Sequence, residues 1–176
     1  MTVHSAAAVS PRHLVLLPLP SSVTVTEALA AIGRLERASP LEVLGAVVVE
    51  RRQDGTVGVA SVSPPIGAEI DDAAWRWLLD GILHRPEPAG GAERLGGPLG
   101  GTGLSESFLA EVRELLATPG QSLAFIASGL DPGASVSELR GFPGARLIYG
   151  VLPPPVLERM LTRPVRGAPG TRPFDR

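Results

Sequence analysis

Residues 104–128 carry the clearest pattern of apolar and polar positions in the chain. In the first half of this segment, apolar side chains recur every three or four residues, which predicts an amphipathic helix with Ser105 as its N-cap. Pro119 then removes a backbone donor and ends the helix. The continuously apolar run 123–127 predicts a strand that is covered on at least one face. We therefore expect a helix packed against a sheet at the centre of the core.

Three strands and a helix are predicted in the first third of the chain. Residues 13–19 predict the first strand. The turn signal QDG at 53–55 predicts a hairpin between residues 41–51 and 56–62, because Asp and Gly tolerate positive φ. A helix is expected between the first strand and the hairpin, with Ile32 on its apolar face.

Four shorter elements complete the prediction. Residues 71–83 indicate a short helix, 136–139 a helical turn, 145–152 a strand and 155–161 a last short helix. The order strand–helix–strand–strand–helix–strand is typical of the split βαβ. We therefore predict an α+β fold: a ferredoxin-like antiparallel sheet with helices on one face, plus an additional C-terminal strand and short helix. Such an open sheet has edges that favour pairing with another copy.

The length of 176 residues indicates a single α+β domain with tails. We place this domain at residues 13–162, between a disordered arm (1–12) and a disordered tail (163–176). The Gly- and Pro-rich residues 84–103 are expected to form a flexible insert. Residues 1–12 have neither a basic region nor a long apolar region, so they do not resemble a secretory signal, and we expect a cytoplasmic protein.

Composition excludes several classes of function. The formal net charge of −2 gives no electrostatic argument for binding nucleic acid. The absence of cysteine excludes disulfides, thiolate metal sites and cysteine nucleophiles. All 16 basic residues are arginines, so a Schiff-base or phosphate-loop lysine is also excluded.

The residues that could carry chemistry do not form a recognisable site. His4, His13 and His84 have no second histidine or carboxylate at metal-ligand spacing. The adjacent Asp71 and Asp72 are expected to cap a helix rather than to act in acid–base catalysis. No Gly-x-Ser-x-Gly nucleophile elbow is present. We therefore predict no catalytic residue, no metal and no cofactor, and we expect the protein not to be an enzyme.

Four segments together resemble a known bacterial family. They are VVVERRQDGTV (47–57), WRWLLDGIL (75–83), GLSESFLAEVRELLATPGQSLAFI (103–126) and LRGFPGARLI (139–148). In order and spacing they resemble domain of unknown function 1269, a family of membrane-associated proteins of unknown function. The resemblance implies a strand–helix–hairpin start, a Gly-rich hydrophobic insert, and then a helix followed by strands.

The chain departs from this family in the insert, which in family members resembles a membrane hairpin. Here Arg76 and Asp80 interrupt the apolar run 75–83, and charged and proline residues follow it. A membrane-spanning helix needs about 20 predominantly apolar residues, and this segment does not provide them. We therefore predict no transmembrane span and keep peripheral membrane contact as an alternative.

Two groups of residues are candidates for contacts with a partner. Trp75 and Trp77 are two apart on the predicted helix, so they cannot face the same way, and at least one is expected to meet a partner, a neighbouring subunit or the insert. Leu78 and Ile82 extend this segment. Arg51 and Arg52, beside the hairpin, could contact an acidic partner.

These observations support one main hypothesis about function and two alternatives. The first is a non-enzymatic protein that self-associates as a homo-oligomer, or binds another protein, within a larger assembly. The second is a regulatory module that binds a small ligand in the cleft between the sheet and the central helix. The third, implied by the family resemblance, is a peripheral membrane or stress-related protein.

Overall fold

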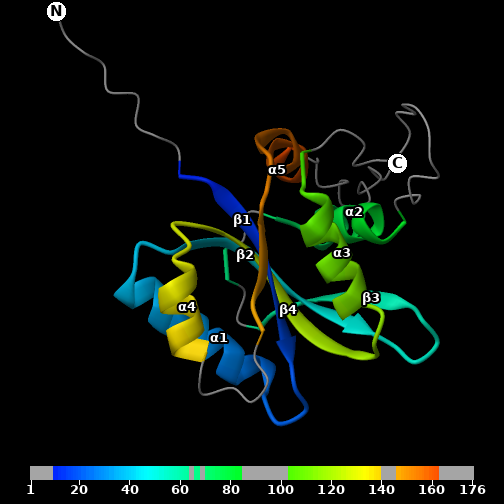
Figure 1. Ribbon diagram of the computed structural model, residues 1–176, viewed down its shortest axis with the longest axis horizontal. Coiled ribbons are helices and arrows are strands. Elements are labelled where there is room, and N and C mark those ends of the chain that lie inside the picture. The colour runs from blue at the N-terminus through cyan, green and yellow to red at the C-terminus, as the bar shows by residue number, and fades with distance from the viewer. Residues whose placement is uncertain (1–9, 64–65, 68–69, 85–102, 140–145, 163–176) are drawn as a thin grey trace, which may run out of the picture.

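The computed structural model describes residues 10–63, 66–67, 70–84, 103–139 and 146–162. In this part of the chain, five antiparallel strands form one sheet in the order β3-β2-β4-β1-β5, and five helices pack around it (Figure 1). In chain order the elements are β1 (Arg12–Leu19), α1 (Val25–Ala38), β2 (Glu42–Arg51), β3 (Val57–Ser61), α2 (Asp72–Leu83), α3 (Glu106–Leu115), β4 (Gly120–Ser128), α4 (Pro132–Leu139), β5 (Ile148–Val151) and α5 (Pro154–Leu161).

Local sequence signals place the ends of several elements. Thr24 and Glu27 form a reciprocal capping box at the start of α1. The side chains of Asp71 and Ser105 each accept a hydrogen bond from the backbone N–H three residues further on, and so cap α2 and α3. Gly55 has φ 87° in the turn between β2 and β3, a conformation that favours glycine. The predicted helices and strands are present, but α4 begins four residues before the predicted helical turn 136–139, and β5 begins three residues after the start of the predicted strand 145–152.

The order of the strands differs from the predicted arrangement. Strand β4 lies between β1 and β2 and is antiparallel to both, so β1 and β2 run parallel to each other. In the same way β1 lies between β4 and β5. The chain therefore passes from β1 to β2 through α1 and from β4 to β5 through α4, and each connection passes over one strand that lies between the two.

The predicted ferredoxin-like assignment had used the hairpin strand β3 where the structure has β4. In the structure β3 pairs with β2 alone and lies at the outer edge of the sheet. Burial explains the difference. Residues 122–128 of β4 are buried, whereas β3 has no buried residue. A central strand that is covered on both faces must be apolar on both, and of these two strands β4 satisfies that requirement and β3 does not.

Both faces of the sheet carry helices, which the prediction had placed on one face. Leu14 and Leu16 of β1 belong to a core shared with α2, α3 and α5, whereas Val15 and Leu17 belong to a second core formed with α1. Successive strand residues point to opposite faces, so an unbroken apolar strand needs cover on both. Figure 1 shows α1 and α4 on one side of the sheet and α2 and α3 on the other. The α+β class and the antiparallel sheet are confirmed.

The predicted arm (1–12), insert (84–103) and tail (163–176) lie almost entirely outside the described residues. Strand β1 begins at Arg12, one residue before the predicted domain start. Among the helices described, none combines the length and the apolar character that crossing a bilayer would require.

Candidate functional site

Three of the predicted interaction residues are core residues. Trp75, Leu78 and Ile82 are each 0% exposed and pack in the core beneath α2. They lie on one helical face with the spacing i, i+3 and i+7, which the sequence pattern already shows. A docking surface made of these side chains is therefore absent from the folded chain, and this part of the prediction is wrong.

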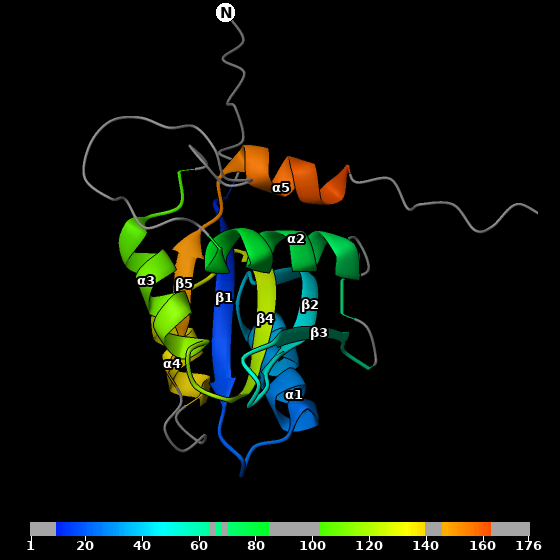
Figure 2. The same ribbon diagram turned by 90° about the vertical axis from the view of Figure 1, so that its right-hand side faces the viewer.

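Trp77 lies on another side of α2 and is partly buried. The guanidinium carbon of Arg159, on α5, lies 4.8 Å from the centroid of the Trp77 ring, in cation–π geometry. Figure 2 shows α5 running alongside α2. The expectation that the two tryptophans face different ways is confirmed. Trp77 contacts Arg159 on α5 of the same chain.

Arg51 and Arg52 lie at the hairpin between β2 and β3. Arg52 Nε is 3.9 Å from a carboxylate oxygen of Glu50, and both side chains are about half exposed. Asp54 accepts hydrogen bonds from the backbone N–H and the hydroxyl of Thr56, at 2.8 and 2.7 Å. These bonds lower the pKa of Asp54, chiefly through the backbone N–H. The polar groups here stabilise a tight turn, and their arrangement indicates no catalytic role.

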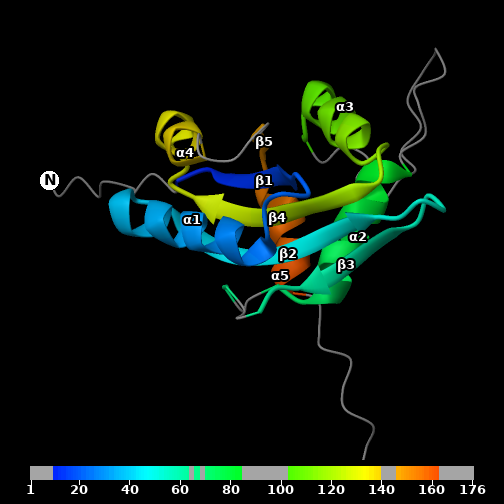
Figure 3. The ribbon, with the colours of Figure 1, turned by 90° about the horizontal axis from the view of Figure 1, so that it is seen from below.

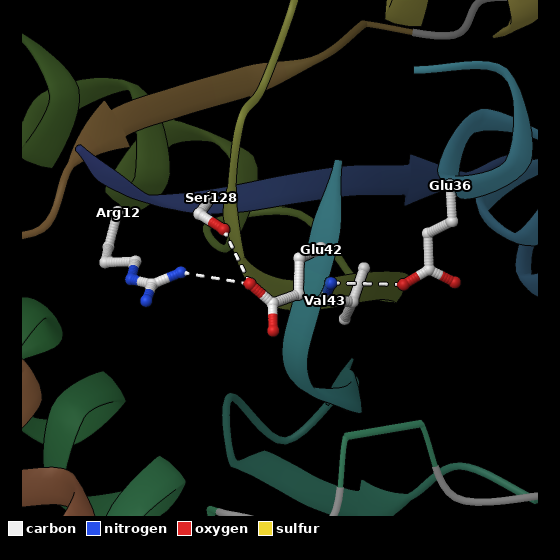
Figure 4. A network of polar contacts seen from close by, with 5 residues as sticks. All are labelled: Arg12, Glu36, Glu42, Val43 and Ser128. Atoms are coloured by element: carbon white, nitrogen blue, oxygen red, sulfur yellow. Dashed lines mark hydrogen bonds and ion pairs between the residues drawn. The ribbon is translucent and has the colours of Figure 1, made fainter. Parts of the chain in front are cut away.

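A second polar group lies where β1, β2 and β4 meet (Figure 4). Glu42 is 3.6 Å from Arg12 and accepts a hydrogen bond from Ser128 at 3.3 Å. Glu36, on α1, accepts the backbone N–H of Val43 at 3.1 Å. Val43 lies at the register shift between β2 and β4, where the ladder loses a bond, so Glu36 satisfies a backbone donor there. These contacts join β1, β2, β4 and α1, so we assign the network a structural role.

A cavity of about 260 Å³ lies between one end of the sheet and the end of α3. Its volume is slightly below the usual range for small-molecule sites. The residues that line it carry no ionisable side chain, so it offers no acid, base or charged anchor. They are Pro18, Leu19, Pro20, Leu115, Leu116, Thr118, Pro119, Gly120, Gln121 and Ser122.

The outer edge of β5 combines exposed apolar side chains with backbone groups that have no partner among the described residues. The Leu152 N–H donates to the Arg12 carbonyl at 2.7 Å, so this pair is a hydrogen-bonded pair of the antiparallel ladder. Because such pairs alternate along the ladder, the N–H and C=O of Tyr149 and Val151 point away from β1, toward the free edge. Their side chains are 43% and 55% exposed. Figure 3 shows β5 at the border of the sheet, with α4 and α3 on either side of it.

The two faces of β5 differ. On the α3 face, a Cβ on Gly150 would lie 2.6 Å from the Phe108 ring, so the absence of a side chain lets the helix approach closely. On the other face, His13 contacts Tyr149 edge-on, with ring centroids 6.2 Å apart. Burial lowers the pKa of His13, and a hydrogen bond with the Pro11 backbone opposes this. The sequence predicts a strand at residues 145–152 and, in general, sheet edges that favour pairing, but it does not single out these residues.

No cluster of three or more His, Cys, Asp or Glu side chains suited to a metal occurs among the described residues. His84 Nδ1 lies 3.1 Å from the Asp80 carbonyl, at the end of α2. His4 lies outside the described part of the chain. Of the candidate surfaces on the described residues, the β5 edge is the one that combines outward-pointing backbone groups with exposed apolar side chains.

Comparisons with protein-family models, with curated proteins and with solved structures found no match for this chain. The resemblance to domain of unknown function 1269 therefore rests on the four sequence segments alone.

Proposed function

We propose that this protein is a non-enzymatic, self-associating component of a larger assembly and that it associates through the β5 edge of its sheet. The observation that carries the proposal is the exposure of Tyr149 and Val151 on a strand whose outer backbone groups have no partner among the described residues. An edge strand of this kind is a template for pairing with another chain.

Two properties of β5 support association rather than simple exposure to solvent. Proteins commonly protect an exposed edge with charged side chains, proline or a bulge. Residues 148–151 contain neither proline nor a charged side chain, and their pairing with β1 is regular. The nearest charged residue before the strand, Arg146, lies 3.2 Å from Glu111 on α3. Two copies could therefore approach along β5 without bringing like charges together within the strand.

The native mass in solution tests this proposal. Size-exclusion chromatography with light scattering should show a multimer whose fraction increases with protein concentration. Val151→Lys places a charge on the free edge and should shift the protein to monomer. Ala60→Lys, on the exposed side of β3, is the matched control and should leave the multimer intact. A wild-type protein that stays monomeric at every concentration would contradict the proposal.

A second candidate function is regulated binding of a small uncharged ligand, supported by the 260 Å³ cavity near the end of α3. A ligand that binds only the folded state raises the apparent melting temperature. Thermal denaturation in the presence of small uncharged compounds should then identify stabilising ones. Leu116→Trp would fill the cavity with a larger side chain and should abolish the increase in melting temperature. An increase retained in this variant would place the ligand elsewhere.

A further inference from the structure

We infer that two copies of this chain pair β5 against β5 in antiparallel orientation, with Gly150 on the two-fold axis and Tyr149 opposite Val151 of the partner subunit. This inference rests on the proposed self-association and specifies its geometry. The result would be one continuous ten-stranded sheet across the dimer.

The backbone supports this register. The N–H and C=O groups of Tyr149 and Val151 point outward, as the hydrogen bond between Leu152 and Arg12 fixes. When Tyr149 faces Val151 of the partner subunit, both residues present outward groups, so each pair can exchange two N–H···O bonds. The two-fold axis repeats the pair on the other side of Gly150. All outward groups of these two residues are then satisfied.

The side chains support the same register. Tyr149 and Val151 lie on one face of β5, and both are exposed. Placing them opposite each other forms an aromatic–β-branched pair on each side of the axis, which is a favourable cross-strand combination. A register centred on either residue would instead place Tyr149 against Tyr149, or Val151 against Val151, of the partner subunit and would form fewer mixed pairs.

A second copy fits this edge better than an unrelated acidic or basic partner. Within residues 147–152 no side chain is charged at neutral pH, so the strand offers no electrostatic selectivity for a charged peptide. An antiparallel two-fold contact is also self-complementary, because each copy supplies the donors and acceptors that the other needs. The small formal net charge of −2 opposes the approach of two copies only weakly.

The absence of cysteine allows a direct test of the register. Tyr149→Cys and Val151→Cys are purified separately, mixed under oxidising conditions and examined by non-reducing electrophoresis. Residues directly opposite in a hydrogen-bonded pair have Cα atoms about 5.5 Å apart, within the range of a disulfide. The mixture should give a covalent dimer that contains one chain of each variant. Each variant alone should give little covalent dimer, because its two cysteines would be diagonal neighbours.

Hydrogen exchange provides a readout that needs no substitution. The amides of Tyr149 and Val151 should become protected as the wild-type concentration rises, while those of Val57 and Val59 on β3 should not change. A wild-type monomer at all concentrations would overturn the proposed function itself. A multimer that crosslinks in Tyr149→Cys alone, or that protects β3 instead of β5, would overturn this register while leaving self-association intact.

Discussion

The two edges of the sheet differ in how they meet solvent. At the β3 edge, Ser61 donates to the Asp72 carboxylate of α2 at 2.9 Å. The guanidinium of Arg52 reaches within 3.7 Å of the position that a Cβ on Gly58 would occupy. Within the described part of the chain, no charged side chain lies on β5 itself, and Tyr149 is exposed there. The two edge strands are nearly equal in length, five residues in β3 and four in β5, so the polar cover of β3 is what distinguishes them.

Truncating the buried side chain of Trp75, on the helix that packs against β3, should cause the largest loss of stability. Trp75 is fully buried on α2, which packs against β3. Trp75→Ala should lower the free energy of unfolding by about 3–5 kcal/mol, because it removes a large side chain and leaves a cavity. Urea denaturation followed by circular dichroism measures this change. A loss below about 1 kcal/mol would contradict the packing described for α2.

A matched pair of glycine substitutions compares how tightly the two edges of the sheet are packed. Gly150→Ala forces a Cβ to within 2.6 Å of the buried Phe108 ring and should cost about 1–3 kcal/mol. Gly58→Ala meets only ordinary contacts, the nearest at 3.7 Å, and should change stability by less than about 0.5 kcal/mol. Chemical denaturation of both variants measures the difference. Equal losses at the two positions would refute the tight packing assigned to the β5 edge.

Loss of the contact between α2 and α5 should lower the free energy of unfolding by less than Trp75→Ala or Gly150→Ala does. Arg159→Ala removes a cation at 4.8 Å from the Trp77 ring and should cost about 0.5–1 kcal/mol. Arg159→Lys should restore part of this loss, because a cation–π contact requires positive charge rather than the guanidinium shape alone. Thermal denaturation would measure both variants, and an alanine variant as stable as the wild type would show that the contact contributes nothing.

Acidification should affect the two edges in different pH ranges. Burial lowers the pKa of His13 beside Tyr149, so the folded protein binds fewer protons than the unfolded chain, and stability should fall as the pH drops through about 6.5. The pKa of Asp54 is also lowered, by hydrogen bonds from Thr56, but its contribution is lost only below about pH 4. Denaturation measured across this pH range should show that His13→Asn abolishes the loss of stability near pH 6.5. Asp54→Asn should abolish the loss of stability below about pH 4.

The sequence predicted the elements well because their signals are local. Ser105, Asp71 and Gly55 each mark an end or a turn through interactions with neighbours a few residues away. Which strand lies between β1 and β2 depends instead on contacts between distant segments. A usable signal was present: residues 123–127 are all apolar, whereas β3 contains Gly58 and Ser61. Weighing burial on both faces would have assigned β4 to the centre.

The candidate site was harder to predict for a physical reason. Hydrophobicity marks side chains that could lie in an interface, but Trp75 satisfies the same preference by entering the core of its own chain. Exposure of Tyr149 follows from its position on an edge strand and from which face of that strand carries α3. The strand itself was predicted from the sequence, at residues 145–152, whereas its position at the edge of the sheet was not.

The central position of β4 also has a consequence for how the chain acquires its structure during synthesis. Neither β1 nor β2 pairs with the other, and contacts such as His13 with Ala127 join residues that the ribosome produces far apart in time. The β2–β3 hairpin can form early, but the first strand has no sheet to join until β4 has left the exit tunnel. Such distant pairing slows folding and leaves apolar strands uncovered meanwhile. A nascent chain that stops before Gly120 would therefore be a natural substrate for chaperones.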